Sequence, residues 1–271
     1  MPELPEVETT RRGLSPHLCD RRVASVHVRD GRMRWPVPAD LNVLLAGRRI
    51  DAVDRRGKYL LIRMDRGCLI AHLGMSGSLR MVAPESPPRK HDHIDIVLQD
   101  GGCLRFHDPR RFGCLLWTEE DPLRHALLSE LGLEPLEEGF SGDYLHDVSR
   151  NRETPVKHLI MDSRVVVGVG NIYANEALFR AGIRPRRAAG RISSGRYDRL
   201  AESIKQALAE AIAQGGTTLR DFVNASGKPG YFQQVLKVYG REGQACSTCA
   251  GLIQSERLGQ RATYFCPRCQ R

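Results

Sequence analysis

Four cysteines near the end of the sequence most restrict how this chain can fold. Cys246-x2-Cys249 is followed, after sixteen residues, by Cys266-x2-Cys269. This spacing is typical of two tight turns that place four thiolates around one tetrahedral Zn²⁺. Four sulfur ligands leave the metal no open position, so we expect one structural zinc ion. Residues 254–265, between the pairs, are expected to form a hairpin that needs the metal to fold.

The other four cysteines indicate the redox environment. They are scattered singly through apparent core segments, at Cys19, Cys68, Cys103 and Cys114. Single, scattered cysteines are typical of a reducing compartment and argue against disulfides, including one between the paired cysteines. The sequence contains no run of eighteen apolar residues and no charged-then-apolar leader. We therefore expect an intracellular protein with no membrane partner.

The net charge indicates the class of partner. The chain has 271 residues and a formal charge of +9, and from Arg241 onward five arginines face two glutamates. A strongly basic protein suits a polyanion, of which nucleic acid is the commonest. A zinc-stapled tail with an ordinary solvated face is the alternative for the basic C-terminal segment. The length allows two domains.

Short segments of strand character fill the first part of the chain. They are separated by Gly and Asp-Gly turns, which is typical of an antiparallel sandwich or barrel. In the first of them, Val23, Ser25 and His27 are predicted to share one face. The predicted strands are 22–29, 50–54, 59–64, 68–73, 78–82, 93–98, 103–107 and 114–118.

Beyond residue 121 the apolar period becomes helical. Helices are predicted at 122–131, at two places within 156–183, and at 195–214, with Asn171 as the N-cap of the second helix in 156–183. The predicted class is α+β. The predicted domains are 1–132, a linker at 133–150, a helical domain at 151–236 and the zinc finger at 237–271.

The first fourteen residues carry unusual chemistry. Prolines and glutamates at the start favour the first turn of a helix, and Gly13 is predicted to end it. If Met1 is removed, Pro2 becomes a free secondary amine beside the carboxyl group of Glu3. The alternative is an N-terminal helix without a chemical role.

Seven blocks of the sequence resemble those of the bacterial formamidopyrimidine-DNA glycosylases. The two ends are 2–9 (Pro-Glu-Leu-Pro-Glu-Val-Glu-Thr) and 259–270, and the inner blocks are 56–61, 72–80, 107–113, 166–173 and 227–231. The resemblance covers essentially the whole chain. One departure is Ala250, which follows the second zinc cysteine where the family commonly has glycine.

The resemblance implies a fold and an activity. The fold is an N-terminal helix with an antiparallel β-sandwich, then a helix–two-turns–helix domain with a C-terminal β-hairpin zinc finger. The activity is base-excision repair: removal of oxidised purines (8-oxoguanine and formamidopyrimidines) from double-stranded DNA, with AP lyase cleavage by β,δ-elimination. We expect a monomer in the bacterial cytoplasm, bound to nucleoid DNA.

The resemblance also assigns catalytic roles. Pro2 attacks the anomeric carbon of the damaged nucleotide and forms a Schiff base, which divides one difficult step into easier ones. Glu3 is the general acid/base that opens the sugar ring. Lys58, which otherwise reads as a solvated loop cation, assists β-elimination. Arg261, otherwise a surface charge of the hairpin, contacts a phosphate and serves as acid for the last elimination.

The remaining site residues are predicted to hold DNA. His91, Arg152 and Lys157 match the family's DNA contacts and would otherwise pass as solvated charges. Asn171 is expected both to cap its helix and to contact a phosphate at the helix N-terminus. An extruded base leaves a hole in the stack, and apolar wedges commonly fill such steps. By resemblance Phe112 is the wedge, with Met75 beside it and Arg110 reading the orphaned cytosine. From the residues alone, Phe112 reads as a loop anchor packed on the core.

One loop and one further residue are also expected to serve the site. Residues 224–230 are expected to cap the flipped base, and Glu176, one turn beyond Asn171, is expected to help order the site. Two rival functions stay open. The sister glycosylase endonuclease VIII shares the fold and the terminal proline but prefers oxidised pyrimidines. A zinc-ribbon DNA-binding protein without catalysis explains the charge and the cysteines but not the Pro-Glu start.

Overall fold

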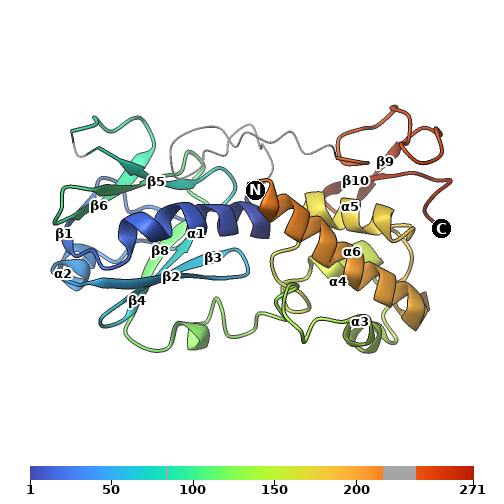
Figure 1. Cartoon of the computed structure of the whole chain (residues 1–271), viewed down its shortest axis with the longest axis horizontal. Coiled ribbons are helices and arrows are strands. Elements are labelled where there is room, and N and C mark those ends of the chain that lie inside the picture. Colours follow the sequence, from blue (N-terminus) through green and yellow to red (C-terminus); the bar gives the residue numbers. More distant parts are fainter. Residues whose placement is uncertain (84, 216–235) are drawn as a thin grey trace. The chain divides into compact units, whose positions relative to one another are not determined.

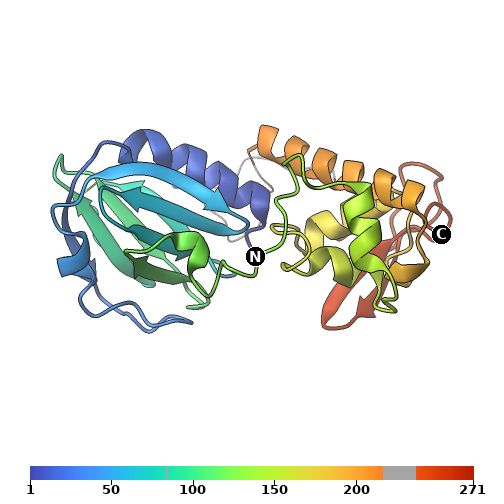
Figure 2. The same cartoon turned by 90° about the horizontal axis from the view of Figure 1, so that it is seen from below.

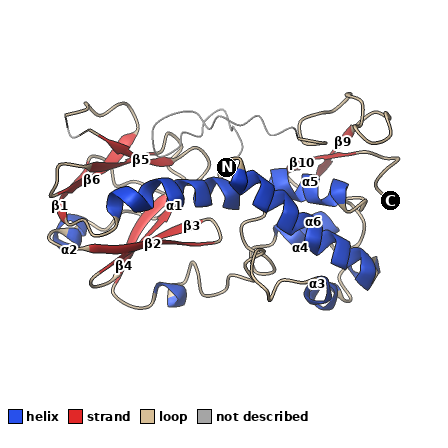
Figure 3. Cartoon of the chain, viewed as in Figure 1, coloured by secondary structure: helices blue, strands red, loops and turns tan. Residues whose placement is uncertain are grey.

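The computed structural model describes residues 1–83, 85–215 and 236–271. The described chain divides into two compact units. The first unit is Met1–Glu130, and the second is Leu131–Gln214 together with residues 236–271. Apart from one hairpin in the second unit, the strands of the described chain lie in the first unit (Figure 3). This division confirms the predicted α+β class. The segment 224–230, predicted as a cap, lies outside the described residues.

Two four-stranded antiparallel sheets build the first unit (Figures 1 and 2). One sheet has the order β1-β6-β7-β5 and the other β2-β3-β4-β8. All eight strands were predicted to within two residues of their ends. Their bounds are β1 Val23–Val28, β2 Ile50–Arg56, β3 Tyr59–Met64, β4 Cys68–His72, β5 Ser78–Val82, β6 Asp92–Leu98, β7 Cys103–His107 and β8 Cys114–Thr118.

The core of the first unit lies between the two sheets. Leu60 and Ile62 of β3 belong to the same buried cluster as Ile94 of β6 and Phe106 of β7. Each of these side chains is at most 1% exposed. Burial of such a side chain contributes about 1.5–3 kcal/mol. The loops at the strand ends are therefore carried on a rigid apolar support.

The predicted alternation along β1 is wrong. Val23 and Val26 are both buried, whereas Ser25 is half-buried and His27 is exposed. The pairing of β1 with β6 shifts between Val23 and Ser25. Such a bulge inserts one extra residue, so the side chains beyond it exchange faces.

A long helix covers one side of the sandwich. α1, Leu4–Leu18, packs against β2 and β5, which are edge strands of the two sheets. The predicted end at Gly13 is wrong, because the helix continues through Pro16 to bury Leu14 and Leu18 completely. The short helix α2 is Leu41–Leu45.

The predicted helix at 122–131 is also wrong. Only the 3₁₀ turn η1, Pro122–Arg124, forms there, and turns follow it. The ring Nδ1 of His125 accepts the N–H of Leu127 at 3.2 Å. This local bond takes a donor that a continuing helix would need, which is how such side chains compete with helix formation.

Helices dominate the second unit. α6 is the longest of the described helices and packs against α3 and α5. A Cβ on Gly142 would lie 2.1 Å from Oδ1 of Asp198, so glycine permits the close approach of α3 to α6. Helices α4, α5 and α6 confirm the prediction. The bounds are α3 Gly142–Ser149, α4 Val156–Met161, α5 Asn171–Arg180, η2 Ala189–Arg191 and α6 Ser194–Ala213.

The C-terminal segment contains the predicted hairpin. β9, Gln254–Leu258, pairs antiparallel with β10, Arg261–Phe265. Its small apolar cluster includes Phe179 of α5, Val238 and Ile253, beside zinc-site cysteines. Within the part of the chain that the structure covers, no helix has the apolar length needed to cross a membrane.

Candidate active site

The start of α1 is held by a reciprocal pair of hydrogen bonds. The backbone N–H of Glu3 donates to Oε2 of Glu6 at 2.8 Å, and the Glu3 carboxylate accepts the backbone N–H of Glu6. This capping box satisfies donors that a helix start leaves open. Pro2 and Glu3 are buried, and Glu6 is completely so. The Pro2–Glu3 peptide therefore has one defined position.

Lys58 lies toward the same end of the first unit as Pro2. α1 and β2 run in opposite directions, because Glu8 pairs with Arg55 while Arg11, further along α1, donates to the Val53 carbonyl. The turn after β2 contains Gly57, whose φ of +57° suits glycine, and then Lys58. Residues that precede Glu8 and residues that follow Arg55 thus approach one another.

Glu8 is the ionic anchor of this arrangement. Its carboxylate accepts hydrogen bonds from Arg11, Arg12 and Arg55. Burial alone would raise the pKa of Glu8, but the hydrogen bonds from Arg11 and Arg12 and the nearby positive charges lower it to about 2. The group is therefore ionised throughout the neutral range and holds α1 on β2.

The loop between β7 and β8 is built around a buried carboxylate. Asp108 is 0% exposed and accepts the backbone N–H groups of Arg110 (3.2 Å) and Gly113 (2.8 Å). Its own N–H donates to the carbonyl of His91 at 3.0 Å. Asp108 therefore joins the predicted DNA contacts His91, Arg110 and Phe112 into one group.

The residues alone suggested that Phe112 is packed on the core, but the structure shows a different position. Its side chain is 44% exposed, and the guanidinium carbon of Arg110 lies 4.9 Å from the centre of its ring. An exposed aromatic ring on a rigid loop, beside a cation, has the properties of a wedge between bases.

The Met75 turn packs directly on the Phe112 loop. A Cβ on Gly74 would lie 2.5 Å from the Gly113 nitrogen, so the two backbones are in contact. Gly74 also donates its N–H to Nδ1 of His72 at 3.0 Å. Burial, helped by the charges of Lys58 and Arg34, lowers the pKa of His72 to about 4. The neutral ring can therefore accept this bond at neutral pH, and Met75, which follows Gly74, is half-buried.

Charged groups hold the turn that carries His91. The buried Asp92 carboxylate accepts from Arg80 (2.8 Å) and from the N–H of Arg89 (2.8 Å), while Arg105 donates to the carbonyl of Ser86. His91 itself has a φ of +75°, which costs about 1–2 kcal/mol for a non-glycine residue. Burial and the positive charge of Lys90 lower the pKa of His91.

In the second unit, three of the predicted residues converge on one strand. Nζ of Lys157 lies 3.1 Å from the carbonyl oxygen of Ala262, and Nδ2 of Asn171 lies 3.0 Å from the same oxygen. Arg261, immediately before Ala262, is exposed. Asn171 is not the N-cap: Gly170 is, and Asn171 is the first residue of α5. Its side chain is thus free to bond to β10.

Two other predicted residues lie elsewhere in this unit. Arg152 is exposed on the connection between α3 and α4, where its backbone pairs with Gly190. Glu176 is 4% exposed, and its carboxylate accepts three successive backbone N–H groups, from Lys237, Val238 and Tyr239, at 2.8–2.9 Å. Glu176 anchors the segment that leads into the zinc finger.

The four paired cysteines form a site for one zinc ion. Their Sγ atoms all lie within 4.8 Å of one another, with Cys246–Cys269 at 3.8 Å and Cys249–Cys266 at 3.5 Å. Zn–S bonds of about 2.3 Å in a tetrahedron require sulfur separations of about 3.8 Å. The predicted ligands therefore fit zinc, and no disulfide joins them.

The first cysteine turn accommodates its departure from the family pattern. Ala250 has a φ of +57°, the left-handed conformation that glycine favours. At Gly251 an added Cβ would lie 2.9 Å from Cδ of Arg268, so a side chain there meets the opposite turn. The turn keeps its form with alanine at a small cost.

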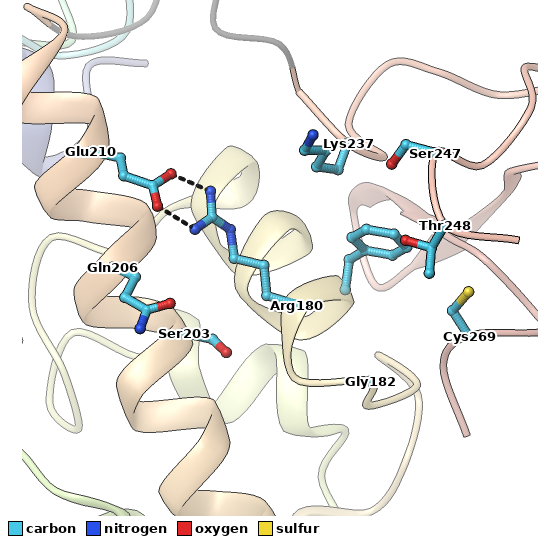
Figure 4. Close-up of a pocket in the computed structure, with 10 residues that line it drawn as sticks. Arg180, Gly182, Ser203, Gln206, Glu210, Lys237, Ser247, Thr248 and Cys269 are labelled. Atoms are coloured by element: carbon cyan, nitrogen blue, oxygen red, sulfur yellow. Dashed lines mark hydrogen bonds and ion pairs between the residues drawn. The ribbon is translucent and has the colours of Figure 1, made fainter.

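A cavity of about 770 Å³ lies between α5, α6 and the zinc segment (Figure 4). Arg180 of α5 makes a two-bond ion pair with Glu210 of α6, at 2.8 and 2.5 Å. Lys237 and Cys269 contribute to the wall. The ion pair of Arg180 with Glu210 braces two helices, and Lys237 is a second cation among the residues that line the cavity.

Sequence reasoning missed the residues that orient the site. Glu6 was detectable, since Glu3-x-x-Glu6 has the spacing of a capping box. Asn175 was also detectable, as it follows Asn171 by one helical turn. Asp108 carries no such signal, because its partners are backbone groups of its own loop.

Known families match both units. Residues 1–115 match the family model described as "Formamidopyrimidine-DNA glycosylase N-terminal domain". Residues 131–223 match "Formamidopyrimidine-DNA glycosylase H2TH domain", and residues 243–271 match "Zinc finger found in FPG and IleRS". The matches follow the chain in the predicted order.

Individual proteins agree over the full length. The chain is 65% identical to the formamidopyrimidine-DNA glycosylase of Methylococcus capsulatus over 271 residues, 100% of both chains. The Fpg (MutM) structure from Thermus thermophilus has a TM-score of 0.89 at 41% identity and covers 99% of this chain and 98% of its own. A Lactococcus lactis Fpg complex with DNA containing Fapy-dG has a TM-score of 0.90 at 33% identity, over 99% and 100%. The chain therefore belongs to the formamidopyrimidine-DNA glycosylase family.

Proposed function

We propose that this enzyme removes oxidised purines from double-stranded DNA and then cleaves the strand, with the nitrogen of Pro2 as the nucleophile. It is a base-excision repair glycosylase with a zinc finger. The observation that carries the proposal is the capping box, which gives Pro2 and Glu3 one buried, defined position at the start of α1. The Fapy-dG-containing DNA bound by the Lactococcus lactis relative supports the substrate class. We propose that the enzyme acts on chromosomal DNA in the cytoplasm.

The first chemical step needs an amine and an acid. With Met1 removed, the Pro2 nitrogen attacks the anomeric carbon of the damaged nucleotide, and the base leaves. Glu3, next in the chain, supplies the proton that opens the sugar ring. A secondary amine yields an iminium that has no N–H to lose. It stays cationic and acidifies the neighbouring C–H, which permits elimination of the flanking phosphates.

The other residues act on the opened intermediate and on the DNA. Lys58, at the same end of the first unit as Pro2, assists β-elimination, and Arg261 assists the last elimination. His91, Arg152 and Asn171 contact phosphates. Lys157 is also a predicted phosphate contact, but its completely buried side chain favours the contact with β10 instead. Zinc, held by the four cysteines, keeps the hairpin folded and takes no chemical step.

A second group of residues replaces the extruded base. Phe112 and Met75 enter the stack, and Arg110 reads the cytosine opposite. Support comes from the exposed Phe112 ring, the Arg110 cation beside it and the shared Asp108 loop. We also propose the domain limits 1–132, 151–236 and 237–271, joined by 133–150.

Borohydride trapping tests the nucleophile. A version with one extra residue before Pro2 should fold, bind zinc and bind lesion-containing duplex, yet form no trapped adduct. Pro5→Ala is the matched control, because it alters the same helix turn and leaves the Pro2 amine free. Equal trapping by the extended and native enzymes would place the nucleophile elsewhere, and Lys58 would be the first candidate.

Glu3→Gln separates the two steps. It should slow base excision by about 10²–10⁴-fold, the usual contribution of general acid–base catalysis. Cleavage at a pre-formed abasic site should fall less, because its aldehyde is already open. Parallel assays with oxidised-purine and oxidised-pyrimidine duplexes distinguish this enzyme from the endonuclease VIII type. Absence of any trapped adduct with the native enzyme would leave only the non-catalytic zinc-ribbon alternative.

A further inference from the structure

Side chains pair with the outer edge of β10. Among the residues that the structure describes, β9 is the one strand that bonds to β10, and it does so along the other edge. On the outer edge, the Ala262 carbonyl accepts from Lys157 and Asn171, at 3.1 and 3.0 Å. Two residues on, the N–H of Tyr264 donates to Oδ1 of Asn175 at 2.8 Å. An exposed strand edge needs partners for its backbone groups, and here helices α4 and α5 provide them.

Lys157 is committed to this contact. Its side chain is 0% exposed, and besides Ala262 its ammonium donates to Oγ1 of Thr263 at 2.7 Å. Burial of an ammonium group is costly unless it is paired and hydrogen-bonded. Lys157 therefore affects the DNA site through its contact with β10. The first residue of this strand, Arg261, is exposed.

Asn175 provides the second half of the same clamp. It is completely buried, and its Nδ2 donates to the carbonyl of Asn171, one turn earlier on α5. One turn of α5 thus holds two positions of β10, at Ala262 and at Tyr264. A slip of one residue would move the strand by about 3.3 Å and turn its side chains to the opposite face.

We propose that Lys157 and Asn175 are positioning residues that lock the register of β10 on α5, so that Arg261 and Asn171 act as one unit in the last elimination. The proposal rests on the proposed function, in which Arg261 assists that step. It adds a role that zinc does not supply, because the cysteines join the two turns of the zinc segment to each other, and the apolar cluster that includes Phe179 of α5 makes no backbone hydrogen bond that would fix the register of β10.

The test measures the products formed at an abasic site. Lys157→Met removes the donor and keeps the chain length, and Asn175→Ala removes the second contact without any change of charge. In single-turnover reactions, each variant should lower the rate of the second elimination at least tenfold relative to the first. Products that stop after β-elimination should accumulate. Trapping of the Pro2 adduct and zinc content should match the native enzyme.

Arg186→Ala is the matched control. The exposed pair of Arg186 with Glu256 also links the helical part of this unit to the hairpin, but through β9. This variant should keep the native product ratio. If zinc content shows that Lys157→Met does not fold, Asn175→Ala alone decides the question.

Two results would overturn the proposal. One is an unchanged ratio of the two eliminations in Asn175→Ala and Lys157→Met. The other is a uniform loss of affinity for plain and lesion duplex in Lys157→Met, with a salt slope reduced by about one and a native product ratio. That pattern is the signature of a direct phosphate contact. Failure of the native enzyme to trap lesion DNA would instead contradict the proposed function.

Discussion

The two units support their site residues in different ways. In the first, Met75, Arg110 and Phe112 sit on short loops at the ends of strands whose core side chains, such as Phe106, are completely buried. In the second, Arg261 sits on a two-stranded hairpin beside a small apolar cluster. Four thiolates and the polar clamp from α4 and α5 hold that hairpin in place. The site loops of the first unit depend on apolar burial, and the hairpin of the second unit depends on specific bonds.

Because of this difference, we expect different conditions to disrupt the site residues of the first unit and those of the second. Apolar burial tolerates loss of a ligand, because no single atom holds the fold together. A hairpin of five-residue strands does not tolerate loss of its metal ligand, because the bound metal supplies folding free energy. Both tryptophans of the chain, Trp35 and Trp117, lie in the first unit. Tryptophan fluorescence therefore reports the first unit alone.

Loss of a zinc ligand should have the largest effect. Structural zinc sites in small domains bind with about 10–16 kcal/mol, so Cys266→Ser should unfold the hairpin. Zinc content should fall from one ion per chain, and DNA affinity should drop, whereas the urea midpoint followed by tryptophan fluorescence should not change. Cys103→Ser, a buried cysteine of the first unit, should give the reverse pattern. Full DNA affinity in a zinc-free protein would contradict the comparison.

Acid should weaken the first unit through His72. Its pKa is about 4 in the fold, against 6.5 for an exposed histidine. Between these values the unfolded chain binds a proton that the folded chain does not, so stability falls as pH decreases from 6.5 to 4. The difference between these two pKa values corresponds to about 3 kcal/mol of stability at most. Glu8, with a pKa lowered from 4.5 to about 2, adds its effect as the pH decreases below 4.5.

Urea unfolding at pH 7 and pH 5, followed by tryptophan fluorescence, checks this effect. His72→Gln should flatten the difference between the two pH values, and the exposed His27→Gln should preserve it. An equal pH dependence in all three proteins would show that protonation of His72 does not limit the first unit.

Arg110→Ala should relax the preference for cytosine opposite the lesion. A base-specific bidentate contact contributes roughly 1–3 kcal/mol, so discrimination should fall by about five- to 150-fold. Zinc content should not change, because Arg110 lies in the first unit. The neighbouring Arg111, paired with Asp30, supplies the control Arg111→Ala. An unaltered opposite-base preference in Arg110→Ala would remove that residue from the reader's role.

The smallest effect should be a gain. Ala250→Gly places glycine at a φ of +57° and should stabilise the zinc segment by about 1 kcal/mol. Ala245→Gly, in the same segment but outside the positive-φ residues, should destabilise it by about 0.4–1 kcal/mol. Competition with a chelator measures both. Slower zinc loss from Ala245→Gly than from Ala250→Gly would reverse the expected order.

Local patterns predicted more of the fold than of the site. Strands such as Tyr59–Met64 and Ser78–Val82 were found to the residue because turn signals border them. The end of α1 was missed because Gly13 is a local signal, whereas burial of Leu18 against the sandwich is not. The Lys157–Ala262 contact spans 105 residues and involves a backbone carbonyl, so no motif could indicate it.

The position of α1 has a consequence for molecular association. The helix lies along β2 and β5, both edge strands, and unpaired edges invite strand addition from another molecule. The helix that follows Pro2 thus also shields these edges from pairing with strands of other molecules. Changes that loosen the packing of α1, such as truncation of the buried Leu14, expose the edges of both β2 and β5 to other molecules. Inactive variants of this helix should therefore precipitate more readily than inactive variants of the hairpin.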